Sequence, residues 1–150
     1  MSTEIISIDG PSGSGKTSVG KLLASDLNCK FISSGLIYRT ITKGIIDLLN
    51  TNTFFQGLYS FSEIYDAFVS NQFIVKILQL RDTGVLIEYK DVENKRTHEH
   101  LSSSKDLYTA EITELTTNLS KIVVIREAVS LFLKEFVMEN GLTVIEGRDI

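Results

Sequence analysis

The segment that most constrains the fold of this 150-residue chain is Gly10-Pro-Ser-Gly-Ser-Gly-Lys16-Thr17, which matches G-x-x-x-x-G-K-[ST] at every fixed position. Its glycines allow the backbone to curl so that several N–H groups converge on one anion. An apolar run, Glu4–Asp9, precedes the segment, and a helical pattern begins at Lys16. A strand, a tight loop and a helix in succession predict the start of a parallel α/β fold.

The chemistry of this loop predicts binding of ATP with Mg²⁺. The positive N-terminal end of the following helix faces the same anion. Lys16 supplies a point charge for the β- and γ-phosphates, and Thr17 supplies a hydroxyl ligand for magnesium. The residues expected to contact the nucleotide are Gly10, Ser12, Gly13, Ser14, Gly15, Lys16, Thr17 and Ser18. Because kinases, ATPases, GTPases and motor proteins share this loop, it does not by itself name a reaction.

Helical and strand patterns alternate at both ends of the chain. We expect strands at 31–32 and 142–146 and helices at 16–27, 35–49, 105–119 and 122–140. Two β-rich segments, 72–80 and 85–92, flank a predicted hairpin turn. The first helix is expected to gather its apolar residues on one face: Val19, Leu22, Leu23 and Leu27. The fold class predicted is α/β, a short parallel sheet flanked by helices with an inserted β-rich region.

Composition limits the class of protein. The net charge of −4 argues against a nucleic-acid or membrane-surface partner, which would need a basic patch. Cys29 is the only cysteine, so an intrachain disulfide is impossible. No signal peptide and no run of 18 apolar residues are visible, so we expect a cytoplasmic protein.

Four further segments resemble the bacterial cytidylate kinases, in the family's order. Phe31–Arg39 resembles (D/S)-(S/T)-G-x-x-Y-R, and Ile145–Ile150 resembles E-G-R-D-I. Val92–Thr97 resembles the I-R-T stretch, and Thr117 with Arg126 keeps an S-x₈-R spacing. The resemblance implies transfer of the ATP γ-phosphate to CMP or dCMP. It also implies a P-loop core at 1–50, an inserted monophosphate-binding region at 51–104, and core helices with a strand at 105–150.

The resemblance also implies roles for single residues. Those expected to bind the substrate are Ser34, Arg39, Arg96, Thr117, Arg126, Arg148 and Asp149. Arg39 and Arg148 would hold the acceptor phosphate and, with Lys16, form the catalytic set, since arginine forks match phosphate oxygens. Thr117, Arg126 and Asp149 would contact the cytosine. Glu146, at the end of a strand, would lie near the magnesium with Thr17.

Other side chains have ordinary structural interpretations. Arg126 lies at the edge of an apolar helical stripe and is expected to be partly buried, so its guanidinium would need a partner. His98 and His100 are expected to be solvated loop residues, and Cys29 a small buried hydrophobe. Arg39 and Arg148 could be surface charges, and Thr117 a helix-end residue.

The chain departs from the family pattern at Ser33, where many relatives have Asp, and at Lys95-Arg-Thr97. The family pattern continues past Ile150 with a strand, an arginine-bearing lid and an adenine-contacting segment. We therefore expect the 150-residue chain alone to be weakly active or inactive. Separately, we expect a monomer rather than an oligomer. Two other hypotheses stay open, namely a kinase of another small acceptor and a non-catalytic nucleotide-binding module.

Overall fold

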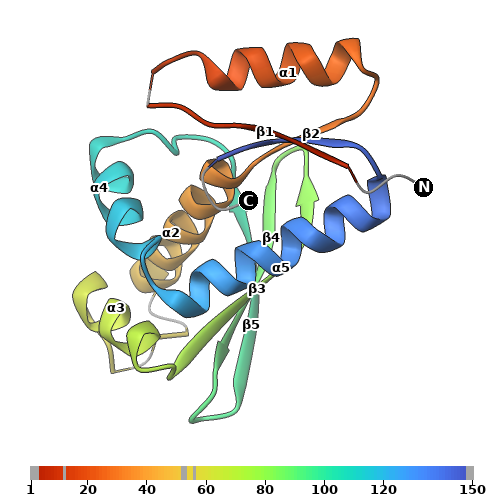
Figure 1. The fold of residues 1–150 in the computed structure, drawn as a ribbon. Coiled ribbons are helices and arrows are strands. Elements are labelled where there is room, and N and C mark those ends of the chain that lie inside the picture. Colours follow the sequence, from red (N-terminus) through yellow and green to blue (C-terminus); the bar gives the residue numbers. More distant parts are fainter. Residues whose placement is uncertain (1–3, 12, 52–53, 56, 148–150) are drawn as a thin grey trace. The chain divides into compact units, whose positions relative to one another are not determined.

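The computed structural model describes residues 4–11, 13–51, 54–55 and 57–147 (Figure 1). The chain divides into two compact units. One combines residues 1–35 with 130–150, and we call it the P-loop unit. The other, residues 36–129, we call the middle unit. The three-part division expected from the sequence, with boundaries after residues 50 and 104, follows chain segments and stays a prediction.

The P-loop unit contains a parallel sheet with strand order β1-β6-β2 (Figure 1). Its elements are β1 (Ile5–Ile8), α1 (Lys16–Asp26), β2 (Lys30–Ser33), β6 (Thr143–Glu146) and the end of α5 (Val123–Asn140). All four residues of the central strand β6 are buried. Ile8 and Ser33 both lie opposite Glu146, so all three strands end at the same edge. That edge faces the segment that follows β1, which is the glycine-rich loop.

Helix α1 lies where the sequence predicted, but the buried face predicted for it is wrong. Val19 and Leu22 are 59% and 63% exposed, whereas Gly20 and Ala24 are buried. A Cβ added at Gly20 would lie 2.5 Å from Cε2 of Phe31 on β2. The helix therefore packs on the sheet through its smallest residues, because a larger side chain there would push the two elements apart.

The middle unit contains an antiparallel sheet with strand order β3-β4-β5. Its elements are α2 (Ser34–Thr51, whose first two residues belong to the P-loop unit), α3 (Phe61–Val69), β3 (Phe73–Arg81), β4 (Gly84–Asp91), β5 (Arg96–Ser103), α4 (Ala110–Leu119) and the start of α5. The hairpin of β3 and β4 is the one predicted. One face of α2 is buried, through Ile37, Ile41, Ile45 and Leu48. The two sheets and their helices confirm the predicted α/β class.

Strand β5 is a correction, since His98 and His100 were expected to be solvated loop residues. Residues 96–103 pair with β4 in unbroken register, from Asp91 opposite Arg96 to Gly84 opposite Ser103. The sequence of β5 is polar because it is an edge strand, where polar and charged side chains discourage pairing with another chain. His100 is therefore a strand residue, and its Nε2 lies 3.2 Å from Oδ2 of Asp47 on α2.

Helix α4 begins at Ala110 rather than at residue 105 as expected. The hydroxyl of Thr109 accepts a hydrogen bond from the N–H of Ile112 at 3.2 Å, which fixes the start of the helix. Leu107 and Tyr108 therefore lie in the connection before α4. None of the helices in the described ranges has the length and apolar composition needed to cross a bilayer.

Candidate active site

Two glycines of the glycine-rich loop have the left-handed backbone conformation that occurs in anion-binding nests. Gly13 and Gly15 have φ angles of 79° and 84°, which favour glycine. Gly15 is the N-cap of α1 and provides no side-chain hydrogen bond to the first turn. The first N–H groups of α1 therefore lack the usual side-chain cap and point toward the loop, where a phosphate would accept from them. Ser12 lies outside the described residues.

Lys16 lies against the loop that precedes it. Its Nζ donates to the carbonyl oxygen of Gly10 at 2.9 Å, and the Gly10 N–H donates to Oδ1 of Asp9 at 2.8 Å. The acceptor for the ammonium group is a neutral carbonyl, so this contact does not cancel the positive charge. Phosphate oxygens would accept from the same group more strongly, because both partners would then be charged.

The two residues predicted to hold magnesium are in direct contact. The Thr17 hydroxyl lies 2.8 Å and 2.9 Å from the two carboxylate oxygens of Glu146. Glu146 ends β6 and is only 6% exposed, so the sheet fixes its carboxylate beside the loop. No group of three or more His, Cys, Asp or Glu side chains suited to a metal occurs in the described part of the chain. One hydroxyl and one carboxylate still fit Mg²⁺, which usually takes its other ligands from phosphates and water.

Ser34 is tied to the same strand end. Its hydroxyl is buried and donates to the carbonyl oxygen of Glu146 at 3.0 Å. Gly147 follows with a φ of 136°, and a Cβ there would overlap Oγ of Ser34. This packing explains why glycine follows Glu146. Arg148 and Asp149 lie outside the described residues, so their predicted roles stay predictions.

In the middle unit, Arg39 extends from α2 toward the start of α4. Its NH1 donates to the carbonyl oxygen of Leu107 and to the Thr113 hydroxyl, both at 2.9 Å. Its Cζ lies 4.4 Å from the centre of the Tyr108 ring. One turn further along α4, the Thr117 hydroxyl donates to the carbonyl oxygen of Thr113 at 2.9 Å. The structure thus brings two predicted substrate residues, Arg39 and Thr117, to the same part of α4.

The other two predicted substrate arginines of the middle unit have different surroundings. Arg96 donates through NH2 to Oδ2 of Asp91 at 3.1 Å and to the carbonyl oxygen of Phe54 at 3.0 Å. It shares no described partner with Arg39. Arg126 is exposed on α5, which corrects the expectation that it is partly buried. Substrate contacts of Arg96 and Arg126 stay predictions.

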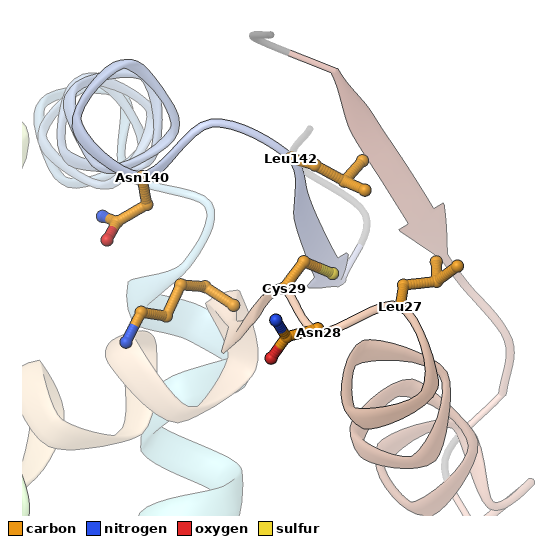
Figure 2. A pocket seen from close by; sticks show the side chains of 6 residues that line it. Leu27, Asn28, Cys29, Asn140 and Leu142 are labelled. Carbon is orange, nitrogen blue, oxygen red and sulfur yellow. The ribbon is translucent and has the colours of Figure 1, made fainter. Parts of the chain in front are cut away.

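A separate pocket of about 370 Å³ opens at the opposite end of the parallel sheet (Figure 2). Its lining residues are Leu27, Asn28, Cys29, Lys30, Asn140 and Leu142. It lies where β2 and β6 begin, whereas Glu146 marks where they end. Cys29 is half-buried at this pocket, not fully buried as expected. The pocket is therefore distinct from the glycine-rich loop.

Comparison with known proteins identifies the family. A sequence model described as cytidylate kinase matches residues 6–150 of this chain. The chain belongs to the cytidylate kinase family. This confirms the resemblance seen in the motifs.

Curated cytidylate kinases align over nearly the whole chain. That of Borrelia duttonii is 35% identical over 147 residues, which are 97% of this chain and 59% of that protein. Cytidylate kinase 1 of Borreliella afzelii is 33% identical over 97% of this chain and 58% of its own length. That of Pseudothermotoga lettingae is 30% identical over 100% of this chain and 56% of its own length. The chain thus spans less than two thirds of the length of these cytidylate kinases.

Proposed function

We propose that this protein transfers the γ-phosphate of ATP to CMP or dCMP, giving CDP or dCDP. The observation that carries the proposal is the match to the cytidylate kinase family over residues 6–150. The relatives named above are cytidylate kinases, and the contact of Thr17 with Glu146 beside the loop suits a phosphoryl-transfer enzyme.

The P-loop unit would hold the donor. Backbone N–H groups of the loop and the first turn of α1 bind the β- and γ-phosphates, with hydroxyls from Ser12, Ser14 and Ser18 nearby. Lys16 moves from the Gly10 carbonyl to the phosphates as a point charge. Thr17 and Glu146, which contact each other here, would hold Mg²⁺ with a hydroxyl and a carboxylate oxygen. Bound there, Mg²⁺ would offset the negative charge of the phosphate oxygens.

The acceptor would bind through the residues that the family resemblance assigns. Arg39, Arg148 and Ser34 would bind its phosphate, with Arg39 and Arg148 stabilising charge on the transferred group. Thr117, Arg126 and Asp149 would select cytosine, since a carboxylate accepts well from the cytosine amino group. Arg96 is paired with Asp91, so it would bind the acceptor only if this ion pair opens. In this proposal residues 51–104 serve as the monophosphate-binding insertion.

We place this activity in pyrimidine nucleotide metabolism in the cytoplasm, where ATP is available. The partners would be the two nucleotides, without nucleic acid or membrane, and the protein would act as a monomer.

The test is to incubate the purified chain with Mg-ATP and each of CMP, dCMP, UMP, AMP and GMP, measuring diphosphate product and equilibrium binding. Since the 150-residue chain alone is expected to be weakly active or inactive, binding is the main readout. We expect CMP and dCMP to bind in preference to the other monophosphates and to be preferred in any transfer that occurs. Lys16→Ala should lower transfer by about 100-fold or more, because an electrostatic donor to the phosphates is lost. A preference for another monophosphate would favour a different kinase. Binding of ATP without binding of any acceptor would favour the non-catalytic module.

A further inference from the structure

The contacts of Arg39 form a cradle that sequence analysis did not anticipate. Three groups surround the guanidinium: the Leu107 carbonyl oxygen, the Thr113 hydroxyl and the ring of Tyr108. All three belong to the connection before α4 or to its first turn. The N-cap Thr109 fixes that turn, so the cradle is built on an ordered helix start.

The partners of Arg39 within the described part of the chain are neutral. Among the described residues, Arg39 forms no ion pair, whereas Arg96 of the same unit lies 3.1 Å from the carboxylate of Asp91. The hydrogen bonds of Arg39 to described residues use only NH1, so two further nitrogens of the guanidinium retain donor capacity. The three groups of the cradle thus orient the positive charge of Arg39 and, being neutral themselves, do not neutralise it.

An oriented arginine is what a phosphate needs. The planar fork of a guanidinium binds two phosphate oxygens at once only when the plane is correctly turned. A flexible arginine loses rotamer freedom on binding, and that loss weakens the complex. Contacts that fix the plane beforehand remove part of this cost.

We propose that Tyr108 and Thr113 are positioning residues, which hold Arg39 ready for the phosphate of the acceptor nucleotide. The inference rests on the proposed function, because it takes the phosphate at Arg39 to be that of CMP or dCMP. Thr113 also has a second role. Its backbone carbonyl oxygen accepts a hydrogen bond from the hydroxyl of Thr117, the residue predicted to contact the base. The first two turns of α4 thus align both ends of the acceptor.

The exposure of Tyr108 allows this role to be separated from folding. Its side chain is 70% exposed, so removing the ring creates no core cavity and should leave stability nearly unchanged. Tyr59, which is 76% exposed in the same unit, is a matched control that is not one of the three groups around Arg39.

The experiment measures dissociation constants of CMP and of Mg-ATP for the purified chain and for Tyr108→Phe, Tyr108→Leu, Thr113→Ser, Thr113→Val and Tyr59→Leu. Loss of the ring contact in Tyr108→Leu should weaken CMP binding about two- to fivefold. The double variant Tyr108→Leu/Thr113→Val should weaken it about tenfold or more, because a hydrogen bond to a charged group is also lost. Phe and Ser should restore wild-type affinity, and Mg-ATP affinity should not change in any variant.

The outcomes separate the two proposals. If the wild-type chain binds CMP and Arg39→Ala weakens that binding, while Tyr108→Leu and the double variant match wild type, the positioning role is overturned and the proposed function stands. Equal weakening by Tyr59→Leu, or parallel loss of Mg-ATP binding, also overturns it. A wild-type chain that binds Mg-ATP but no CMP overturns the proposed function, and the positioning role with it.

Discussion

Two arginines of the middle unit show how partners decide the role of a side chain. Arg96 is paired with Asp91, a carboxylate that is only 1% exposed, and is stacked 5.3 Å from the Phe54 ring. Arg39 has a carbonyl, a hydroxyl and a ring instead. The charge of Arg96 is thus matched by a carboxylate. That of Arg39 meets only neutral groups in the described ranges, which suits Arg39 for an anionic ligand.

Asp91 predicts a pH dependence of stability. Burial raises the pKa of its carboxyl, but hydrogen bonds from the side chain and backbone of Asn94 and from Arg96 outweigh this and lower the pKa below the ordinary value of 3.8. The folded pKa is therefore below the unfolded one. The carboxylate contributes stability at pH values above 3.8, and this contribution is lost as the pH falls through the lower folded pKa.

We expect Asp91→Asn to lower the free energy of unfolding at pH 7 by about 1–3 kcal/mol, since charged hydrogen-bond partners are lost. The variant should also lose less stability than wild type as the pH falls below 3.8 through the lower folded pKa of Asp91. Urea titrations over this range, with exposed Asp82→Asn as control, measure both effects. Equal acid sensitivity of Asp91→Asn and wild type would contradict the assignment.

At the scale of elements, α2 depends on a glycine in its middle. A Cβ at Gly44 would overlap the hydroxyl of Tyr89 on β4 and lie 2.5 Å from Oγ of Ser102 on β5. Tyr89 is fully buried, and its hydroxyl donates to the Ile41 carbonyl oxygen at 3.0 Å. Gly44 therefore allows the helix and the strands to approach closely.

Gly44→Ala should lower the free energy of unfolding by about 1–3 kcal/mol through overpacking, although alanine favours helices. Gly35→Ala on the same helix is a matched control, because its Cβ would meet only Oγ of Ser33 at 3.8 Å. The double variant Gly44→Ala/Tyr89→Phe should recover part of the loss, since the clashing oxygen is gone. Denaturant unfolding tests this, and an unchanged Gly44→Ala would refute the close packing.

Elements with strong local patterns were predictable from the sequence. The helical pattern at 35–49 correctly predicted α2. The glycine-rich segment correctly predicted a loop between β1 and α1. Strand β5 was missed because its residues are polar, and the buried face of α1 because glycine and alanine form it. Tyr108 and Thr113 carried no signal at all. Arg39 lies 68 and 74 positions from Leu107 and Thr113, and no local pattern encodes such contacts.

At the scale of the whole molecule, α1 leaves apolar side chains in solvent. Val19 and Leu22 lie one turn apart and are both more than half exposed. Exposed apolar groups of this kind promote association between copies at high concentration.

Leu22→Lys should therefore change the free energy of unfolding by less than about 0.5 kcal/mol and reduce self-association. Ala24→Lys, at a position only 3% exposed, should instead destabilise strongly. Sedimentation velocity and urea unfolding measure the two effects. Strong destabilisation by Leu22→Lys would show that this face of α1 is covered in solution.

The strand order of the parallel sheet determines when this sheet can form during translation. In the described sheet, β1 and β2 pair only with β6, and β6 lies more than 100 residues beyond them. Residues 36–129 form a continuous unit and have their antiparallel partners close by in the chain. Domains generally fold as units during synthesis. The middle unit can therefore fold while β1 still lacks its partner strand β6. The nucleotide loop thus acquires its acidic partner, Glu146, only when translation has passed residue 146.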